Sequence, residues 1–316
     1  MPDPHPSYRS FTRDDYDEIF TSRRNWNRWG ADDQLGALNL IDSAKRRQAV
    51  ALVQTGELIS LSRPYPKDID DANPRPALHF LQATEHDVVD FYGISYHGIQ
   101  STHIDALCHV WGSEGMWNGR DPQESLDAKG AKWGDIDQWR NGIVTRGVLL
   151  DVPRYRGVGF VDQEHPVHGD ELAAIAEAQG TPLQPGDAMV VYSGRDAWTR
   201  ANGYEWGSGP RLGRSLGPLD RDPRPGLHAS CLEFIRDSDC ALMAWDMMDL
   251  LPNGLGVVHS VHAAIFMFGI ALVDNVLLEP LANACGAAGR YEFMFTVAPL
   301  RVAGGTGSPV NPIVML

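Results

Sequence analysis

The segment Tyr96–Trp111 reads Y-H-G-I-Q-S-T-H-I-D-A-L-C-H-V-W, and it concentrates side chains that bind metals or transfer protons. His103, Asp105 and His109 fall within seven residues. Residues two apart on an extended strand point to the same face, so His103 and Asp105 can bind one ion without a reversal of the chain. A tight bend after Asp105 would return His109 to the same place. His97 precedes His103 by six residues, on the same alternation.

These residues have an alternative explanation as ordinary packed or surface side chains. A single histidine is more often such a residue than a ligand. Three polar groups inside an apolar segment are harder to explain in this way, because an ionised aspartate is costly to bury without a partner. A metal ion or a neighbouring imidazolium is the obvious partner for Asp105. The segment therefore predicts a metal site or a proton-transfer site.

A second pair of candidate residues lies in the last quarter of the chain. His262 belongs to the segment 259–268, which we expect to form a helix that stops at Gly269. Asp274 closes a predicted strand over 270–273. Its apolar neighbours again make a buried carboxylate costly unless it is paired. His259 is the weaker alternative to His262.

Thr102, His103, Asp105 and His109 resemble part of the motif His-x-Gly-Thr-His-x-Asp-x-Pro-x-His. This motif is typical of the cyclase family of metal-dependent hydrolases, which includes bacterial kynurenine formamidase and isatin hydrolase. In this chain Ile99, Ser101 and Leu107 stand at the positions of the leading His, the Gly and the Pro. The change at Ile99 leaves open whether one ion or two would bind, and His97 replaces the missing ligand only if the strand bulges.

The resemblance extends over most of the chain. The stretch W-G-A-D-D-Q-L-G-A-L-N at 29–39 is similar to the N-terminal segment of larger family members, and the Gly-rich segment 303–309 is similar to their closing segment. The resemblance implies an α/β fold, a single domain of the swivelling β/β/α type with a mixed sheet. We expect this domain to span residues 1–316, with 1–24 as an N-terminal extension.

The resemblance also implies a set of site residues. In the family a His and a Glu twelve residues apart complete the metal site, and His262 and Asp274 match that spacing with Asp in place of Glu. We therefore expect His103, Asp105, His109 and Asp274 as metal ligands. His109 and His262 are the candidates for proton transfer, and either can instead complete a second metal shell.

Imidazole and carboxylate ligands suit Mn²⁺ or Zn²⁺. Such an ion with open coordination positions lowers the pKa of a bound water and polarises a carbonyl. We expect a metal-dependent hydrolase that opens a cyclic amide or lactone, or cleaves an N-formyl amide, with a metal-activated water. A metal-dependent lyase, dehydratase or cyclase acting through an enolate is the alternative. A non-catalytic metal-binding protein ranks last, because the chain lacks a closed, Cys-rich ligand set.

The bulk properties exclude several functions. The net charge of −14 argues against nucleic acid and anionic membranes as partners. No G-x-S-x-G motif of a serine hydrolase is present. The four cysteines suggest no disulfide framework, and no signal peptide precedes the first residues, so we expect a cytoplasmic protein. The expected partners are a small cyclic or aromatic substrate and further copies of the chain, in a dimer or tetramer.

Periodicity and capping residues predict the remaining elements. We expect a helix over 14–21 with Thr12 as its N-cap, and a long loop over 112–137 that could form one wall of a pocket. His228 is equally a cap residue or a substrate contact, and Asp151 is equally functional or a cap. The other predicted helices are 42–54, 171–179 and 229–236, the predicted strands are 57–62, 77–83, 87–93, 143–152, 188–192, 239–246, 290–300 and 310–316, and the predicted loops are 64–76 and 193–215.

Overall fold

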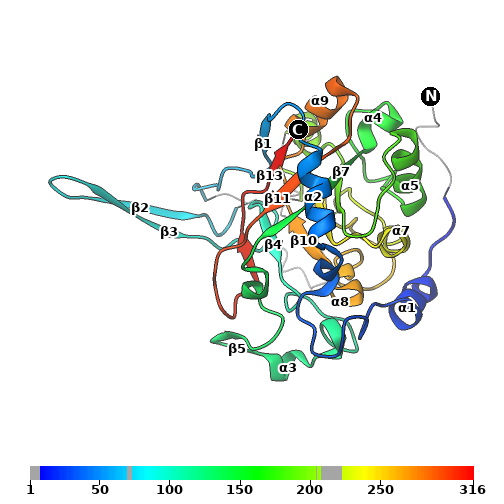
Figure 1. Ribbon diagram of the computed structural model, residues 1–316, viewed down its shortest axis with the longest axis horizontal. Helices are drawn as coiled ribbons and strands as arrows, with labels where there is room; N and C mark the ends of the chain where they lie inside the picture. Colours follow the sequence, from blue (N-terminus) through cyan, green and yellow to red (C-terminus); the bar gives the residue numbers. More distant parts are fainter. Residues whose placement is uncertain (1–7, 70–72, 204, 208–222) are drawn as a thin grey trace.

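The fold is built around one mixed sheet, seen in a computed structural model that describes residues 8–69, 73–203, 205–207 and 223–316. In this part of the chain nine strands pair in the order β1-β13-β11-β7-β8-β9-β10-β4-β12. Their bounds are β1 Leu58–Ser60, β4 His103–Asp105, β7 Ile143–Asp151, β8 Ala188–Tyr192, β9 Leu242–Trp245, β10 Ala271–Asp274, β11 Glu292–Val297, β12 Gly307–Pro309 and β13 Ile313–Met315. The predicted mixed α/β fold is confirmed (Figure 1).

Strands β7, β8, β9 and β10 run parallel and neighbour one another in chain order. Nearly all of their residues are buried, as expected for parallel strands covered on both faces. Parallel neighbours need crossover connections, and five helices lie in the connections between these strands. These helices are α4 Val152–Arg156, α5 Gly169–Ala178, α6 Arg195–Asn202, α7 Cys231–Ser238 and α8 Ala264–Phe268.

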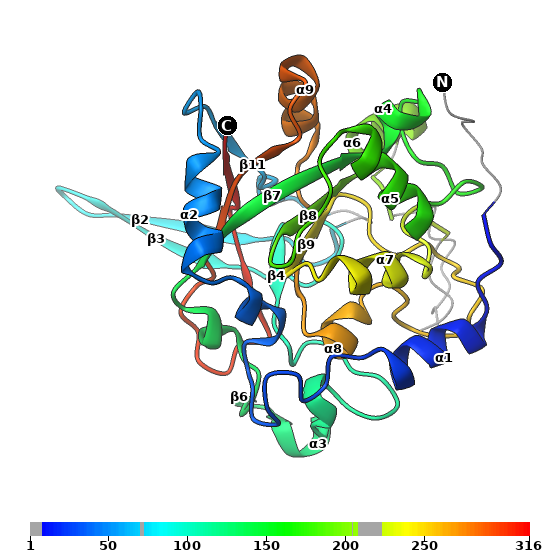
Figure 2. The ribbon, with the colours of Figure 1, turned by 45° about the vertical axis from the view of Figure 1, so that its right-hand side comes forward.

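Three further helices complete the body. Helix α2 (Ser43–Ala51) packs against β7 and β11, and α9 (Glu279–Ala288) packs against β7. Figure 2 shows α2 on one side of β7 and α5 on the other. Helix α1 (Arg13–Ser22) begins at Thr12 with a capping box that includes Asp15, as predicted, and buries Tyr16, Ile19 and Phe20. Part of the expected N-terminal extension therefore belongs to the core. None of the described helices is both long and apolar enough to cross a bilayer.

Strands β2 (Leu78–Ala83) and β3 (Val88–Gly93) form a separate two-stranded ribbon, which we call the arm. Both strands were predicted, over 77–83 and 87–93. The arm projects far from the body of the molecule (Figures 1 and 2). Its chain then continues directly into the segment that carries His97.

Several predicted boundaries were wrong. Helix α2 ends at Ala51 rather than at residue 54. The predicted loop 193–215 contains helix α6. This helix forms because the carboxylate of Asp246 accepts hydrogen bonds from the backbone N–H groups of residues 193–195 and so caps its N-terminus. Residues 204 and 208–215 of the predicted loop lie outside the described residues. Helix α8 starts at Ala264, so His262 lies in the turn before it. The loop 112–137 contains short elements: η2 (Trp117–Gly119), α3 (Pro122–Ser125), β5 (Leu126–Asp127), β6 (Gly130–Ala131) and η3 (Ile136–Trp139).

Candidate metal centre

Strand β4 brings the first group of candidate ligands together through its pairing. It lies antiparallel between β10 and β12, and Asp274 of β10 is directly opposite His103. Directly opposite residues in an antiparallel pair share a face, so His103, Asp105 and Asp274 point to the same side of the sheet. His103 Nε2 lies 3.4 Å from Asp105 Oδ1 and 3.8 Å from Asp274 Oδ2. All three side chains are buried.

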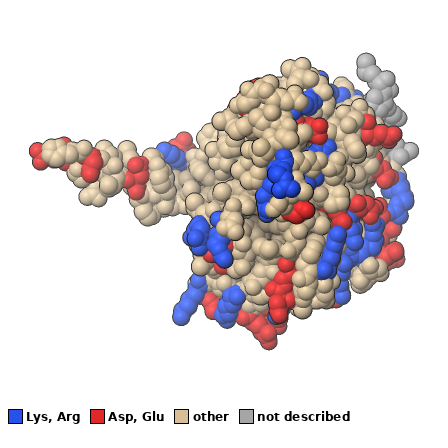
Figure 3. Space-filling view, in the orientation of Figure 1, with Lys and Arg blue, Asp and Glu red and all other residues tan. Residues whose placement is uncertain are grey.

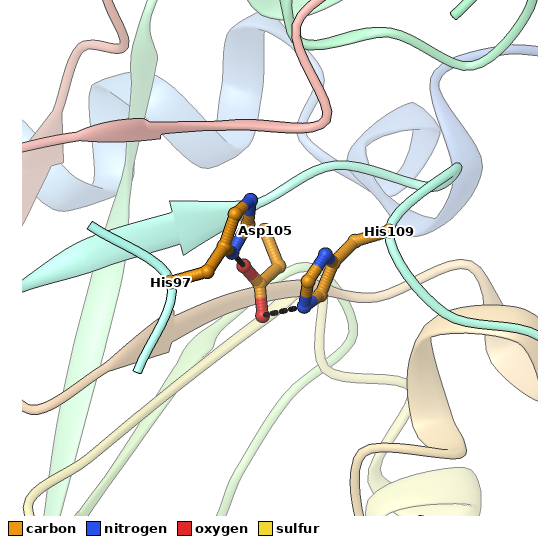
Figure 4. Close-up of side chains that lie close together, drawn as sticks. All are labelled: His97, Asp105 and His109. Carbon is orange, nitrogen blue, oxygen red and sulfur yellow. Dashed lines mark ion pairs between the residues drawn. The ribbon is translucent and has the colours of Figure 1, made fainter. Parts of the chain in front are cut away.

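His97 and His109 approach the same carboxylate from the segments before and after β4. His97 Nδ1 lies 3.1 Å from Asp105 Oδ1, and His109 Nε2 lies 3.7 Å from Asp105 Oδ2 (Figure 4). The two imidazole rings stack with centroids 3.9 Å apart. His109 returns through a tight turn in which its N–H bonds to the carbonyl of Ala106, as its spacing predicts. The segment before β4 is irregular rather than extended, so the strand alternation predicted for His97 was wrong although its ring reaches the site.

Gly307 of β12 makes room for His97. It is directly opposite Asp105, so a side chain there would point to the face that carries the candidate ligands. A Cβ at this position would lie 2.9 Å from His97 Cε1 and 3.3 Å from a ring carbon of Tyr96. The Gly-rich closing segment therefore has a defined role, because its strand β12 lets the imidazole of His97 lie close over the sheet.

Asp105 is a buried carboxylate surrounded by imidazoles. Both of its oxygens are shielded from solvent, and neither accepts a hydrogen bond from the described residues. Burial alone would raise the pKa of Asp105, but the neighbouring His109, His103 and His97 lower it well below its ordinary range. Burial lowers the pKa of His109 to about 4, which leaves its ring neutral at pH 7. The group thus combines an ionised carboxylate with at least one neutral imidazole, which is the protonation that metal ligands require.

A second carboxylate, Asp249, orients His262. It contacts His262 Nδ1 and accepts hydrogen bonds from the backbone N–H groups of residues 260–262. His262 Nε2 then lies 3.1 Å from Asp274 Oδ2. Burial would lower the pKa of His262, but Asp249 and Asp274 raise it well above its ordinary value. Trp245 Nε1 donates to the other oxygen of Asp274, so this carboxylate is held from two sides.

Three of the candidate imidazoles have one ring nitrogen engaged and the other directed at a carboxylate. His103 Nδ1 bonds to the carbonyl of Ser101 at 2.8 Å, and His97 Nε2 lies 3.1 Å from Thr306 Oγ1. Asp249 does the same for His262. Metal-binding histidines are typically oriented in this way by a second group. The candidate ligands form two groups that share Asp105, namely His103–Asp105–Asp274 and His97–Asp105–His109. Within each group, one possible ligand atom of each residue lies within 4.8 Å of those of the other two.

A cavity of about 350 Å³ opens beside these groups. We expected the loop 112–137 to form one wall of this cavity, and that prediction was wrong. The wall is formed by segments around the candidate ligands and by the stretch 248–262. The lining residues are Arg75, His97, Gly98, Ile99, His103, His109, Val110, Arg224, Met248, Asp249, Leu251, Val258, His259, His262 and Asp274. The site therefore joins a polar floor to a partly apolar wall.

Other residues singled out in the sequence have structural positions. Asp151 caps α4 through the N–H of Arg154, and His228 bonds to Ser230 Oγ and stacks on His168, outside the cavity lining. Cys108 is a free buried thiol, like the other three cysteines, and belongs to neither ligand group. His259 lines the cavity, with its ring 5.7 Å from that of His262.

Sequence reasoning missed two residues that orient the site. Trp245 and Asp249 lie in the run A-L-M-A-W-D-M-M-D-L-L, which is apolar except for its two acids. The cost of burying an unpaired carboxylate, which drew attention to Asp105 and Asp274, applies equally to Asp249. That signal would have identified Asp249 as a paired residue, although not its partner.

The chain was also compared with known proteins. The model of the Cyclase family matches residues 59–250. A solved structure of a novel cyclase is 27% identical, with a TM-score of 0.78 over 93% of this chain and all of that chain. Isatin hydrolase A from Ralstonia solanacearum is 12% identical, with a TM-score of 0.57 over 82% of this chain and 91% of its own. An isatin hydrolase bound to the product analogue thioisatinate is 12% identical, with a TM-score of 0.56 over 82% and 92%. A comparison with curated proteins found no match.

Proposed function

This chain belongs to the cyclase family, and from that premise we propose that it is a metal-dependent hydrolase acting on an amide or lactone carbonyl. The observation that carries the proposal is Asp105. Asp105 is a fully buried carboxylate with three imidazoles against it, and a divalent cation between these groups would compensate its desolvation while leaving the imidazoles neutral. The imidazoles around it are metal ligands as well as bases.

The donor set fits a divalent cation. We propose that His103, Asp105 and Asp274 hold one ion, since they are buried together and their ligand atoms lie close to one another. His97, Asp105 and His109 form the second group, and we propose that they would hold a second ion when one binds. Mixed imidazole and carboxylate ligands favour Mn²⁺ or Zn²⁺ over Mg²⁺ or Ca²⁺, which prefer oxygen alone. A bound divalent ion would supply Lewis acidity toward a carbonyl and acidify a bound water.

The side chains of the cavity have the remaining tasks. Ile99, Met248 and Leu251 offer apolar surface for a ring, and the polar floor orients the carbonyl. When no second ion is bound, we assign proton transfer to His109, whose neutral ring can accept the proton of the attacking water and pass it to the leaving nitrogen or oxygen, because its side chain is 25% exposed and lines the cavity. His262 is held between two carboxylates, so we assign it the orientation of Asp274 or a place in the metal shell.

The substrate class follows from the size and lining of the cavity. About 350 Å³ lies within the usual range of small-molecule sites. A cyclic amide, a lactone or an N-formyl anilide combines a flat apolar part with one reactive carbonyl. A cavity next to the ligands also favours catalysis over a closed structural metal site, which would have no open coordination position.

Metal analysis and a substrate screen test the proposal together. Purified protein should contain Mn²⁺ or Zn²⁺, and it should hydrolyse at least one member of a panel of isatin, lactones and N-formyl anilines. Chelation should abolish the turnover, and adding back the ion should restore it. His103→Ala should lose both metal and activity, whereas His168→Ala, a histidine outside the site, should keep both. If His103→Ala binds as much metal as the wild type, the ligand assignment is wrong.

We further propose that the expected homo-oligomer forms through the arm. Register places Leu78, Phe80, Val89 and Phe91 on one face of the ribbon, which we call the apolar face of the arm because the opposite face carries His79 and Asp90 beside its own exposed apolar residues. Their exposed fractions are 48%, 59%, 50% and 56%. A two-stranded ribbon alone is marginally stable in water, and its projection from the body prevents its own chain from covering this face (Figure 1). A second copy of the chain is the partner that the family resemblance favours.

A further inference from the structure

Asn275 and Arg195 form a buried network behind the candidate ligands. Asn275 follows β10 directly, is fully buried and has a φ of 57°. Its side-chain NH₂ donates to the carbonyls of Gly98 at 2.7 Å and Ser101 at 3.1 Å. Its backbone carbonyl accepts a hydrogen bond from Thr102 Oγ1 at 2.8 Å. One asparagine therefore holds the segment 98–102 at three points.

Arg195 holds the same segment from α6. Its guanidinium donates to Asn275 Oδ1 at 2.7 Å and to the carbonyl of Ile99 at 2.5 Å. The side chain is 1% exposed, and the carboxylates of Glu205, Asp196 and Asp246 interact with it electrostatically. The guanidinium also lies 4.9 Å from the ring centroid of Trp206. Burying a guanidinium is costly, so its position calls for a role beyond packing.

The held segment determines the geometry of two candidate ligands. Ser101 contributes the carbonyl that engages His103 Nδ1, which leaves Nε2 free to face Asp105 and Asp274. The same segment turns the chain so that His97, next to Gly98, reaches Asp105. The network therefore contacts no candidate ligand atom directly but fixes the backbone on both sides of Ile99.

We propose that Asn275 and Arg195 are positioning residues that fix His97 and the ring tautomer of His103 for metal binding. The proposal rests on the proposed function, because it assigns the network a role at the same site. At position 99 the resembling family carries a histidine, whereas this chain presents a backbone carbonyl that Arg195 binds. The network thus compensates for the altered motif by presenting His97 from two residues earlier.

The substitution Asn275→Asp separates positioning from stability. An aspartate keeps the acceptor for Arg195 and adds an opposite charge, so the ion pair should offset part of the thermal stability lost with the two hydrogen bonds. It removes the NH₂ donor and puts a carboxylate oxygen against the carbonyls of Gly98 and Ser101, which should release the segment 98–102. Asn275→Gly serves as a second variant, because glycine tolerates the positive φ and lacks the amide. Arg156→Lys is the control, since Arg156 is a buried arginine paired with Glu171 away from the site.

Two measurements on the full chain decide the proposal. In metal-free protein, hydrogen exchange of peptides covering 98–102 should speed up in both Asn275 variants and stay unchanged in Arg156→Lys. Calorimetric titration with Zn²⁺ or Mn²⁺ alone should show about 10- to 100-fold weaker binding in the Asn275 variants, the range expected for outer-shell residues. Unchanged exchange, or faster exchange with unchanged metal affinity, overturns the positioning role. A wild-type chain that binds neither ion overturns the proposed function instead, while the exchange result still decides whether the network holds the segment.

Discussion

Asp105 is a charged residue that is fully buried, whereas Phe80 is an apolar residue that is largely exposed. The carboxylate of Asp105 is 0% exposed and accepts no hydrogen bond from the described residues, whereas the phenyl ring of Phe80 is 59% exposed. The first belongs to the group around β4, which we call the β4 group (His97, His103, Asp105, His109 and Asp274). The second belongs to the apolar face of the arm. On the side of the arm seen in Figure 3, acidic residues are scattered among a larger uncharged surface.

The two regions are close in sequence but have opposite needs. Only nine residues separate the end of the arm at Gly93 from His103. A buried charge needs a counter-charge, and an exposed apolar face needs a surface to cover it. The comparison therefore points to two different partners, a cation for the β4 group and a protein surface for the arm. Four predictions test this difference.

The largest effect should come from Asp105→Asn. Asparagine keeps the shape of the side chain but lacks the charge that both ligand groups share, so metal binding and hydrolysis should be abolished. Metal content after purification and turnover on the substrate that wild type hydrolyses measure the effect. Asp187→Asn is the matched control, because Asp187 is equally buried but pairs with Lys45 and Arg146. The comparison breaks if Asp105→Asn binds the ion as tightly as wild type.

The arm should respond to substitution on one face only. Each phenylalanine buried at an interface contributes about 1.5–3 kcal/mol, so Phe80→Ser with Phe91→Ser should weaken self-association by more than about a hundredfold. Sedimentation across a concentration series measures this. Leu81→Ser with Val88→Ser, on the opposite face, should leave the association unchanged. Equal effects of the two double variants, or a monomeric wild type, would contradict the assigned interface.

A moderate effect should follow from Trp245→Phe. The change removes the donor to Asp274 but keeps an aromatic ring beside His262, so metal affinity should fall about tenfold with little change in the fold. Calorimetric titration with Zn²⁺ or Mn²⁺ measures it. Trp139 is a buried tryptophan whose N–H has no partner among the described residues, so Trp139→Phe should leave the affinity unaltered. Equal affinities for the wild type and Trp245→Phe would exclude this orienting role.

The smallest effect should be the pH dependence of stability that comes from His168, a histidine outside both the β4 group and the arm. Burial lowers the pKa of His168 to about 3, and its ring stacks on Tyr8 and His228. As the pH falls, the imidazole of His168 is therefore protonated in the unfolded chain before it is protonated in the folded chain. The free energy of unfolding should then fall as the pH drops below about 6.5. The loss should reach roughly 1 kcal/mol by pH 5.5, after allowance for partial exposure. Urea unfolding of metal-free protein should show a smaller loss in His168→Phe, and identical pH profiles would refute the assignment.

Local sequence patterns predicted much of the fold. Thr12 and Asp15 form the expected capping box because that interaction needs only residues three apart. Strands β8, β2 and β3 lie within one residue of their predicted bounds, since alternating or continuous apolar runs specify them directly. Helix α6 was missed because its N-terminus is capped by Asp246, about fifty residues later in the chain, which no local pattern reveals.

The sequence by itself determined that His103 and Asp105 share a face, because the period of a strand is a local property. It also marked Asp274 as an acid that needs a partner, from the cost of burying its charge. Only the tertiary structure decided that β10 lies beside β4, that His97 reaches Asp105 across Gly307, and that Trp245 and Asp249 hold the second carboxylate and its histidine. These contacts join residues far apart in the chain, and their geometry depends on strand register and packing rather than on spacing in the sequence.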